Sequence, residues 1–112
     1  MTGNGPQIAI LDYGMGNLRS VEKALEKVGA DPVVTSEEAV IASSAGVILP
    51  GVGAFPRAME RIRELGMDRM LREAAARDLP VLGICLGLQL LFGSSTEQGG
   101  AEGLGLLDGD VD

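Results

Sequence analysis

The sequence predicts an α/β fold of three layers, in which a mostly parallel sheet carries helices on both faces. Three observations support this class. Short apolar runs alternate with amphipathic segments, a pattern typical of β–α–β units with right-handed crossovers. Glycine-rich loops follow the apolar runs, and the chain has 17 glycines in 112 residues. The order of segments also suggests where a site lies, because such sheets place their sites in loops after the carboxyl ends of strands.

The first β–α–β unit is predicted from two short apolar runs and the helical segment between them. Residues 7–11 are expected to form a buried strand, and a second strand is expected at 32–35. The helix between them is expected to begin after an N-cap at Asn17 and to end before a C′ glycine at Gly29. Its apolar positions recur at spacings of three and four: Leu18, Val21, Leu25 and Val28.

The next unit begins with a short helix from about 36 to 42 and a third strand at 46–50. Pro56 suits the first turn of the following helix, and a second helical piece is expected over 67–77. The side chains of these two pieces that are expected to face inward are Met59, Ile62, Leu65, Met70, Leu71 and Ala74.

The last elements are a fourth strand at 80–84, a helix over 86–92 and a short strand suggested by Leu106 and Leu107. The length corresponds to one domain. No closing helix follows the strand-like residues at the end of the chain. We therefore expect residues 1–112 to be the N-terminal portion of a single domain.

The composition excludes several classes of function. Nine basic and sixteen acidic residues give a net charge of −7, which disfavours nucleic acids and anionic membrane surfaces as partners. The longest apolar stretch, residues 81–92, is interrupted by glycines and a glutamine and is too short to span a bilayer. The start of the chain has no basic segment typical of a signal peptide, so a cytoplasmic location is expected.

The single cysteine cannot form an internal disulfide. The chain has no histidine, the most common general base and metal ligand.

The strongest functional pattern is a cysteine between two glycines where the fourth strand should give way to a helix. Gly83, Cys85 and Gly87 fit a nucleophile elbow, in which a sharp turn leaves little room for a Cβ two residues before and after the nucleophile. The helix N-terminus would lower the pKa of the Cys85 thiol, and the Leu86 N–H would stabilise an oxyanion beside it. The alternative is a small buried cysteine at an ordinary strand–helix junction.

Two further features lie where a substrate of such a nucleophile would bind. Gln89 is the only polar residue of 86–92 and lies one helical turn after Cys85, so its amide could contact the substrate. The loop of residues 50–53 ends the third strand, and its glycines allow a backbone N–H to complete an oxyanion hole. The alternatives are a partly solvated glutamine and a common β–α turn.

A dinucleotide site fits the sequence poorly. Gly14 and Gly16 follow the first strand, but Arg19 occupies the position of the third glycine of the dinucleotide fingerprint. The second strand ends in Thr35 rather than in an acidic residue that would hold a ribose.

Three segments in this order and spacing carry a resemblance to a known family: residues 12–21, 49–55 and 83–92, followed by 103–107. The chain resembles the class I glutamine amidotransferases, from about Ile8 to its last residue. The elbow is shared by that whole class. The first two segments resemble more particularly the glutaminase subunits of imidazole glycerol phosphate synthase, which act in histidine biosynthesis.

The resemblance implies a role for each matching residue. Cys85 would attack the side-chain amide of glutamine to give a thioester and ammonia, and the N–H groups of Val52 and Leu86 would form the oxyanion hole. Three residues would hold the glutamine: Gly53, Gln89 and Glu97. Four residues would lie near the partner, a (β/α)8 cyclase subunit that receives the ammonia: Asp12, Tyr13, Asn17 and Arg19. Neither a metal nor an organic cofactor is implied.

The chain departs from the family in its catalytic triad. The family completes the triad with a histidine and a glutamate from the second half of the domain. The sequence has no histidine, and it ends before that half begins. We therefore expect the 112 residues alone to be inactive or nearly so. Two alternatives stay open: another cysteine-elbow hydrolase, and a non-catalytic α/β binding module in which Cys85 is only packed.

Overall fold

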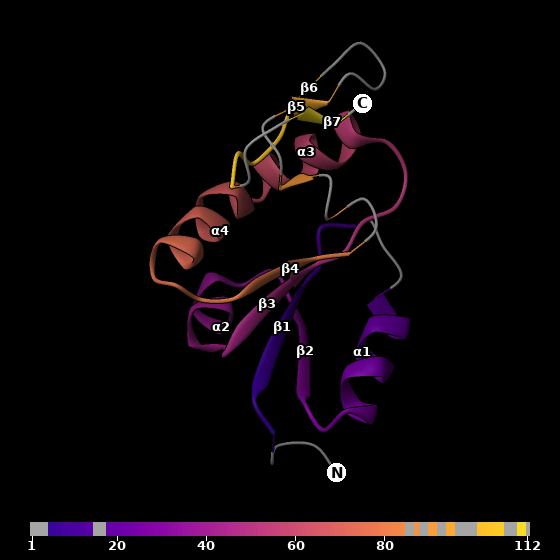
Figure 1. Ribbon diagram of the computed structural model, residues 1–112, viewed down its shortest axis with the longest axis vertical. Helices are drawn as coiled ribbons and strands as arrows, with labels where there is room; N and C mark the ends of the chain where they lie inside the picture. The colour runs from indigo at the N-terminus through magenta and orange to yellow at the C-terminus, as the bar shows by residue number, and fades with distance from the viewer. Residues whose placement is uncertain are drawn as a thin grey trace.

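A computed structural model of the chain describes residues 5–14, 18–84, 87, 90, 91, 94, 95, 101–106, 110 and 111. Its main sheet has four parallel strands in the order β2-β1-β3-β4 (Figure 1). The strands are β1 (Gln7–Leu11), β2 (Asp31–Thr35), β3 (Gly46–Leu49) and β4 (Val81–Gly83). All four lie where the sequence predicts a strand, and the parallel α/β class is confirmed.

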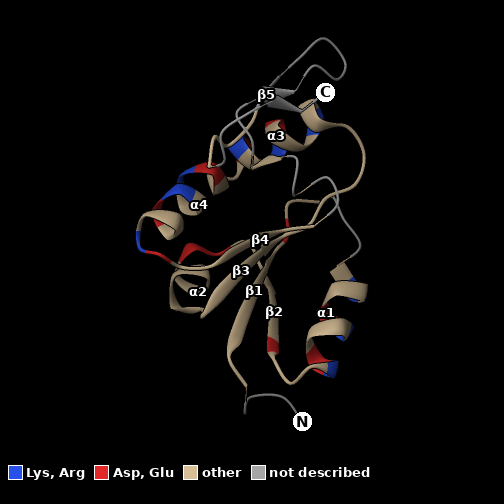
Figure 2. Ribbon diagram, viewed as in Figure 1, with Lys and Arg blue, Asp and Glu red and all other residues tan. Residues whose placement is uncertain are grey.

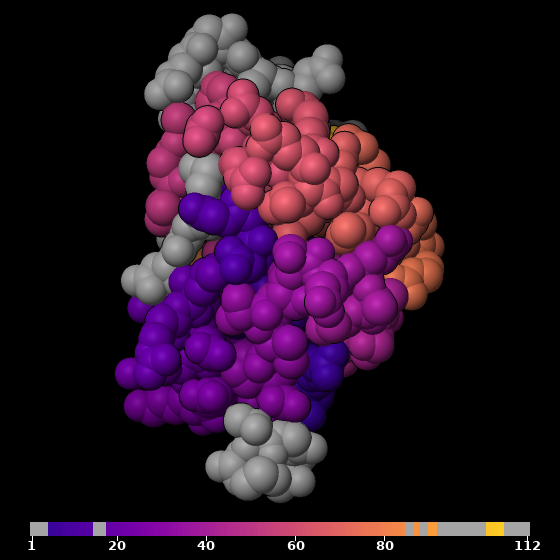
Figure 3. Space-filling view, turned by 180° about the vertical axis from the view of Figure 1, so that it is seen from behind, coloured from indigo at the N-terminus to yellow at the C-terminus, as the bar shows by residue number. Residues whose placement is uncertain are grey.

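Helices cover both faces of this sheet. They are α1 (Leu18–Lys27), α2 (Glu38–Ser43), α3 (Phe55–Glu64) and α4 (Met67–Ala76). α1 packs on β1 and β2, whereas α2 and α4 contact each other on the opposite face, and α4 also contacts β4. Seen from behind, the first part of the chain (indigo to purple) forms the lower half of the molecule, with α3 and α4 above it (Figure 3).

The main core fills the space between the sheet and the helices α2, α3 and α4. Alternate strand residues point into it, and the helices add their apolar faces. Its fully buried members from these elements include Ala9, Leu11, Leu49, Phe55, Ala58, Met59, Ile62, Met67 and Leu71. The intervening strand residues Ile10 and Ile48 are also buried, and the alternation of strand side chains directs them to the α1 face.

The end of α1 follows the prediction at one residue and departs from it at another. Gly29 adopts a φ of +92°, and the N–H of Ala30 donates to the Leu25 carbonyl at 3.0 Å, as expected for a C′ glycine in a Schellman motif. Val28, predicted to belong to the apolar face, is 78% exposed. The helix ends at Lys27, so Val28 lies beyond the turn that would have directed it to the sheet.

A second, smaller sheet has the order β6-β5-β7. It consists of β5 (Ser94–Ser95), β6 (Ala101–Glu102) and β7 (Asp110–Val111). β5 is antiparallel to β6 and parallel to β7. The strand predicted at 106–107 is not found at Leu106, which lies in a bend, while Leu107 lies outside the described residues. No helix in the described part of the chain is long and apolar enough to cross a membrane.

Candidate active site

The carboxyl ends of three neighbouring strands bring the predicted functional loops together. β3 lies between β1 and β4, so the loops after Leu11, Leu49 and Gly83 leave the sheet at the same edge. This is the edge at which open α/β sheets bind their ligands. The loop after β1 contains Tyr13, the loop after β3 contains the predicted oxyanion residue Val52, and the loop after β4 leads to the elbow.

Two residues of the predicted elbow, Ile84 and Gly87, pack directly on the end of β3. The Ile84 N–H donates to the Leu49 carbonyl at 3.0 Å, and the Gly87 N–H donates back to the Ile84 carbonyl at 2.9 Å. A Cβ on Gly87 would lie 1.8 Å from the Leu49 oxygen and 3.3 Å from the Pro50 carbonyl carbon. Only glycine can occupy this position without a shift of the backbone. The structure therefore supplies the close approach for which an elbow needs its second glycine.

Tyr13 connects the loop after β1 to the loop after β3. Its side chain is 0% exposed, and its hydroxyl donates a hydrogen bond to the Pro50 carbonyl. Burial raises the pKa of the Tyr13 hydroxyl above its usual range, so the group stays a neutral donor even at alkaline pH, where a free tyrosine ionises. The backbone carbonyl of Tyr13 accepts a hydrogen bond from Nε of Arg61, on α3, at 3.3 Å.

The loop of residues 50–53, here called the oxyanion loop after its predicted role, connects β3 to α3. Gly51 is buried, whereas the Val52 side chain is 53% exposed. Gly53 has a φ of +90°, a conformation that strongly favours glycine. No hydrogen bond joins the Val52 N–H to another residue in the part of the chain that the structure describes. Val52 thus has a backbone donor without an acceptor in that part, as an oxyanion site requires.

Several predicted site residues lie outside the described residues. These are Cys85, Leu86, Gln89, Glu97 and Asn17. Their predicted roles therefore stay predictions. Among the described residues near them, Gly87 and Leu90 are helical, and Leu90 is buried in the main core. The Leu104 N–H donates to the Leu90 carbonyl at 2.8 Å.

The residues predicted to face a partner differ in their exposure. Asp12 and Arg19 are exposed, whereas Tyr13 is fully buried among core residues. A partner could meet the Tyr13 side chain only after displacing it from the core. Of the four predicted residues, Asp12 and Arg19 are the ones exposed in the described part of the chain.

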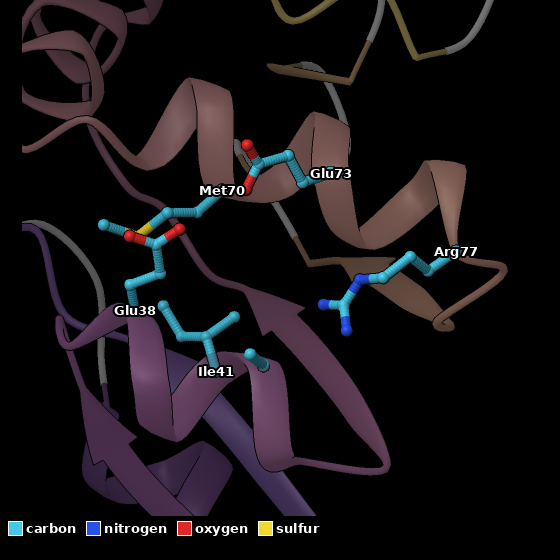
Figure 4. A pocket seen from close by; sticks show the side chains of 6 residues that line it. Glu38, Ile41, Met70, Glu73 and Arg77 are labelled. Carbon is cyan, nitrogen blue, oxygen red and sulfur yellow. The ribbon is translucent and has the colours of Figure 1, made fainter.

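A separate hollow lies between α2 and α4, away from the three loops (Figure 4). Glu38 and Ile41 line it from α2, and Met70 and Glu73 line it from α4. Arg69 binds Glu38 at 2.8 Å and Glu73 at 3.2 Å beside it. Figure 2 shows charged residues on the helices, in loops and on β2, whereas β1, β3 and β4 carry none. The hollow thus lies at the contact between α2 and α4, beside an exposed ion pair.

Sequence reasoning missed Arg61 and the inward role of Tyr13. Arg61 lies on a helix that is amphipathic in sequence, where an arginine is expected to be a solvated charge. Tyr13 is the only tyrosine and one of three aromatic residues in the chain. Its place in a glycine-rich loop directly after a buried strand was the available signal, because a large aromatic side chain there tends to pack back on the core.

The comparison with known families agrees with this geometry. The family profile "Glutamine amidotransferase class-I" matches residues 9–103, most of the chain. The chain belongs to the class-I glutamine amidotransferase family. The matched residues include the three loops at the carboxyl edge of the sheet.

Among the relatives of this class-I amidotransferase, the curated proteins that match include the imidazole glycerol phosphate synthase subunit HisH of Bacillus cereus strain G9842. It is 57% identical over 104 residues, which cover 93% of this chain and 50% of that protein. The subunit HisH of Moorella thermoacetica is 55% identical, with the same coverage. That of Oceanobacillus iheyensis is 51% identical, over 93% of this chain and 52% of its own. The chain thus spans about half the length of these relatives.

A solved structure shares the fold of this amidotransferase chain. It is described as the crystal structure of a glutamine amidotransferase, with a TM-score of 0.76 and 19% sequence identity. The match covers 92% of this chain and 54% of that one. At this identity the likeness concerns the fold, which agrees with the three-layer architecture predicted from the sequence.

Proposed function

We propose that the chain is the nucleophile-bearing half of a glutaminase, the ammonia-producing subunit of an imidazole glycerol phosphate synthase. The observation that carries the proposal is the packing of Gly87 on Leu49 and Pro50, which supports an elbow at Cys85 next to the oxyanion loop. The relatives of 51 to 57% identity named as HisH subunits support the choice of reaction. Family membership supports glutamine as the substrate.

The proposed chemistry uses Cys85 as nucleophile. Its thiolate attacks the side-chain amide carbon of glutamine, and the resulting oxyanion accepts hydrogen bonds from the N–H groups of Val52 and Leu86. Collapse of this intermediate expels ammonia, whose additional proton comes from a general acid, and leaves a glutamyl thioester. Water then hydrolyses the thioester to glutamate and regenerates the thiol. In this proposal Gly53, Gln89 and Glu97 hold the substrate.

The general acid and base must come from outside the chain. The sequence has no histidine, and no carboxylate of this chain is assigned to the triad. We propose that a histidine and a glutamate from a polypeptide equivalent to the remaining half of the relatives complete the site. Removing a triad member typically lowers the rate by several orders of magnitude. The 112 residues alone are therefore expected to release no measurable ammonia from glutamine.

The proposed assembly is a heterodimer in the cytoplasm. Its second subunit is a (β/α)8 cyclase, which uses the ammonia in a lyase-type ring closure. In this proposal the cyclase contacts the segment that contains Asp12, Asn17 and Arg19. The acidic net charge supports a protein partner over nucleic acid or an anionic membrane. Neither a metal nor an organic cofactor enters the proposed chemistry.

The experiment reconstitutes the site from its parts. The chain is co-expressed with the remaining half of the Bacillus cereus relative and with a cyclase subunit, and glutamate release from glutamine is measured. We expect turnover only in the reconstituted sample, and its loss in a Cys85→Ala variant. Glutamine turnover by the chain and the cyclase without the remaining half of the relative would contradict the proposal that the chain lacks part of the triad. Ester cleavage without glutamine turnover would favour another cysteine hydrolase, and ordinary alkylation of Cys85 at neutral pH would favour a binding module.

A further inference from the structure

We propose that Tyr13 is a positioning residue for the oxyanion loop. Its buried hydroxyl holds the Pro50 carbonyl and so fixes the backbone that presents the Val52 N–H. The catalytic meaning of this inference rests on the proposed glutaminase function. Its structural content, a loop held by one tyrosine hydroxyl, can be tested on the chain without any activity.

Pro50 is the point at which such a hydrogen bond has most effect. Proline has no N–H, so the carbonyl is the only backbone group through which a neighbour can hold this residue by a hydrogen bond. Pro50 is buried, and a buried carbonyl requires a donor. The Pro50 carbonyl and the Gly51 N–H share one peptide plane. Fixing the carbonyl therefore fixes the direction in which the loop continues toward Val52.

The loop needs this anchor because its own residues restrict it little. Gly51 and Gly53 flank Val52, and glycine samples more backbone conformations than any other residue. The chain is fixed again where α3 begins at Phe55, a fully buried residue. Between Pro50 and Phe55 the loop therefore depends on how firmly its two ends are held.

Tyr13 is itself held in place. Its ring is fully buried, and its carbonyl accepts the hydrogen bond from Nε of Arg61, whose Nη1 binds Glu64 at 2.8 Å. Just before it, the Asp12 N–H donates to the Thr35 carbonyl at 3.0 Å. Arg61 belongs to α3, the helix that follows the oxyanion loop. One residue thus connects β1, the start of the loop and the helix after its end.

The first test removes only the hydroxyl. In the 15N-labelled chain, Tyr13→Phe is expected to speed amide hydrogen exchange of the buried Gly51 by about tenfold, because the Pro50 carbonyl in the same peptide plane loses its donor. Val52 and Gly53 are exposed, so Gly51 is the reporter of the loop. Exchange in β1 and β2 should be unchanged. The control is Ile62→Val, which loosens the same core from α3 and should not speed exchange in the loop selectively. Unchanged loop exchange in Tyr13→Phe, or an equal increase in the control, would overturn the proposal.

The second test needs no variant. Tyr13 is the only tyrosine and the chain has no tryptophan, so ultraviolet absorbance follows the ionisation of this single group. We expect tyrosinate to form only together with unfolding, because the buried hydroxyl is held neutral. Ionisation of the folded chain at about pH 10, the ordinary tyrosine value, would refute the buried hydrogen bond.

The two proposals can fail separately. In the reconstituted enzyme, Tyr13→Phe is expected to lower kcat by about tenfold or more with little change in the KM for glutamine, since the oxyanion donor acts in the transition state. If loop exchange rises but no preparation turns over glutamine, the positioning role stands and the glutaminase proposal fails. If the enzyme is active and loop exchange is unchanged, the positioning role alone fails.

Discussion

At the scale of single residues, the predicted elbow requires that residue 87 be a glycine, which has no side chain. Gly87 lies so close to β3 that a Cβ would meet the Leu49 oxygen at 1.8 Å. The same Leu49 oxygen accepts the Ile84 N–H, so the strand end cannot move away without breaking that bond. Ile84 and Gly87 are thus held against Leu49 and Pro50 at the end of β3 by contacts between backbone atoms.

This geometry predicts an unequal response to alanine at two glycines. Gly87→Ala should lower the free energy of unfolding by about 3 kcal/mol, because the added methyl group displaces backbone. Gly66→Ala is the control: Gly66 has a φ of +71° but open space around its Cβ position, so it should cost only about 1 kcal/mol. Urea denaturation of both variants measures the difference. Equal losses would mean that the close packing at the elbow is absent in solution.

Tyr13 shows what a sequence motif conveys and what it omits. Tyr13 lies within the residues that the family profile matches. The resemblance of its segment predicted that it would lie near a partner. The structure places the side chain in the core, because a large ring directly after a buried strand finds more apolar contact inward than outward. The direction of a loop side chain depends on tertiary packing, and no local spacing in the sequence specifies it.

At the scale of elements, the apolar runs and helical spacings predicted the main sheet and its helices well. The four strands are short and apolar and lie between clear loop signals, so their positions follow from local pattern. The second sheet could not be found in this way. Its strands are two residues each, and they include serine, glutamate and aspartate. Strands of this kind are defined by their pairing partners, which are distant in sequence.

The end of α1 gives the second prediction. Val28 is 78% exposed beyond the last helical turn, so Val28→Lys should change the free energy of unfolding by no more than about 0.5 kcal/mol. Leu71→Ala on α4 removes a fully buried side chain from the main core and should cost about 2–5 kcal/mol. Chemical denaturation distinguishes them. A large loss of unfolding free energy in Val28→Lys would mean that Val28 does pack on the apolar face, as its spacing predicted.

The ion pair between Glu38 on α2 and Arg69 on α4 gives the third prediction. The hydrogen bond from Arg69, followed by its charge, lowers the pKa of Glu38. A carboxyl with a lowered folded-state pKa contributes stability above its ordinary pKa, and that contribution is lost as the pH falls. Between about pH 6 and pH 3 the wild-type chain should therefore lose slightly more stability than Glu38→Gln. Both groups are exposed, so the effect is small and salt weakens it.

The measurement is urea denaturation across that pH range at low salt. In an Arg69→Met background, Glu38→Gln should no longer change the pH dependence, because the partner that lowers the pKa is gone. An equally steep acid loss in wild type and Glu38→Gln would show that the pair does not hold α2 to α4 in solution.

At the scale of the whole molecule, the chain combines a well-packed interior with half the length of its relatives. One face of the sheet carries three helices and the continuous core, whereas the other carries α1 on β1 and β2. β4 is the last strand of the described four-stranded sheet. Its central residue, Leu82, pairs in register with buried Ile48 and yet is 57% exposed. Ile10, Ile48 and Leu82 are neighbours across β1, β3 and β4, and the last of these apolar residues is exposed to solvent.

An exposed apolar residue on an edge strand favours pairing between sheets, which charged residues on edges normally oppose. We therefore expect the isolated chain to self-associate as its concentration rises, and Leu82→Lys to reduce this association without unfolding it. Val28→Lys is the matched control, because it also replaces an exposed apolar residue by lysine but lies outside any strand. Sedimentation velocity of the three proteins provides the measurement. Both substitutions move the net charge from −7 to −6, which weakens self-repulsion, so reduced association cannot come from net charge. If Val28→Lys reduced association as much as Leu82→Lys, exposed apolar surface in general rather than the β4 edge would govern it.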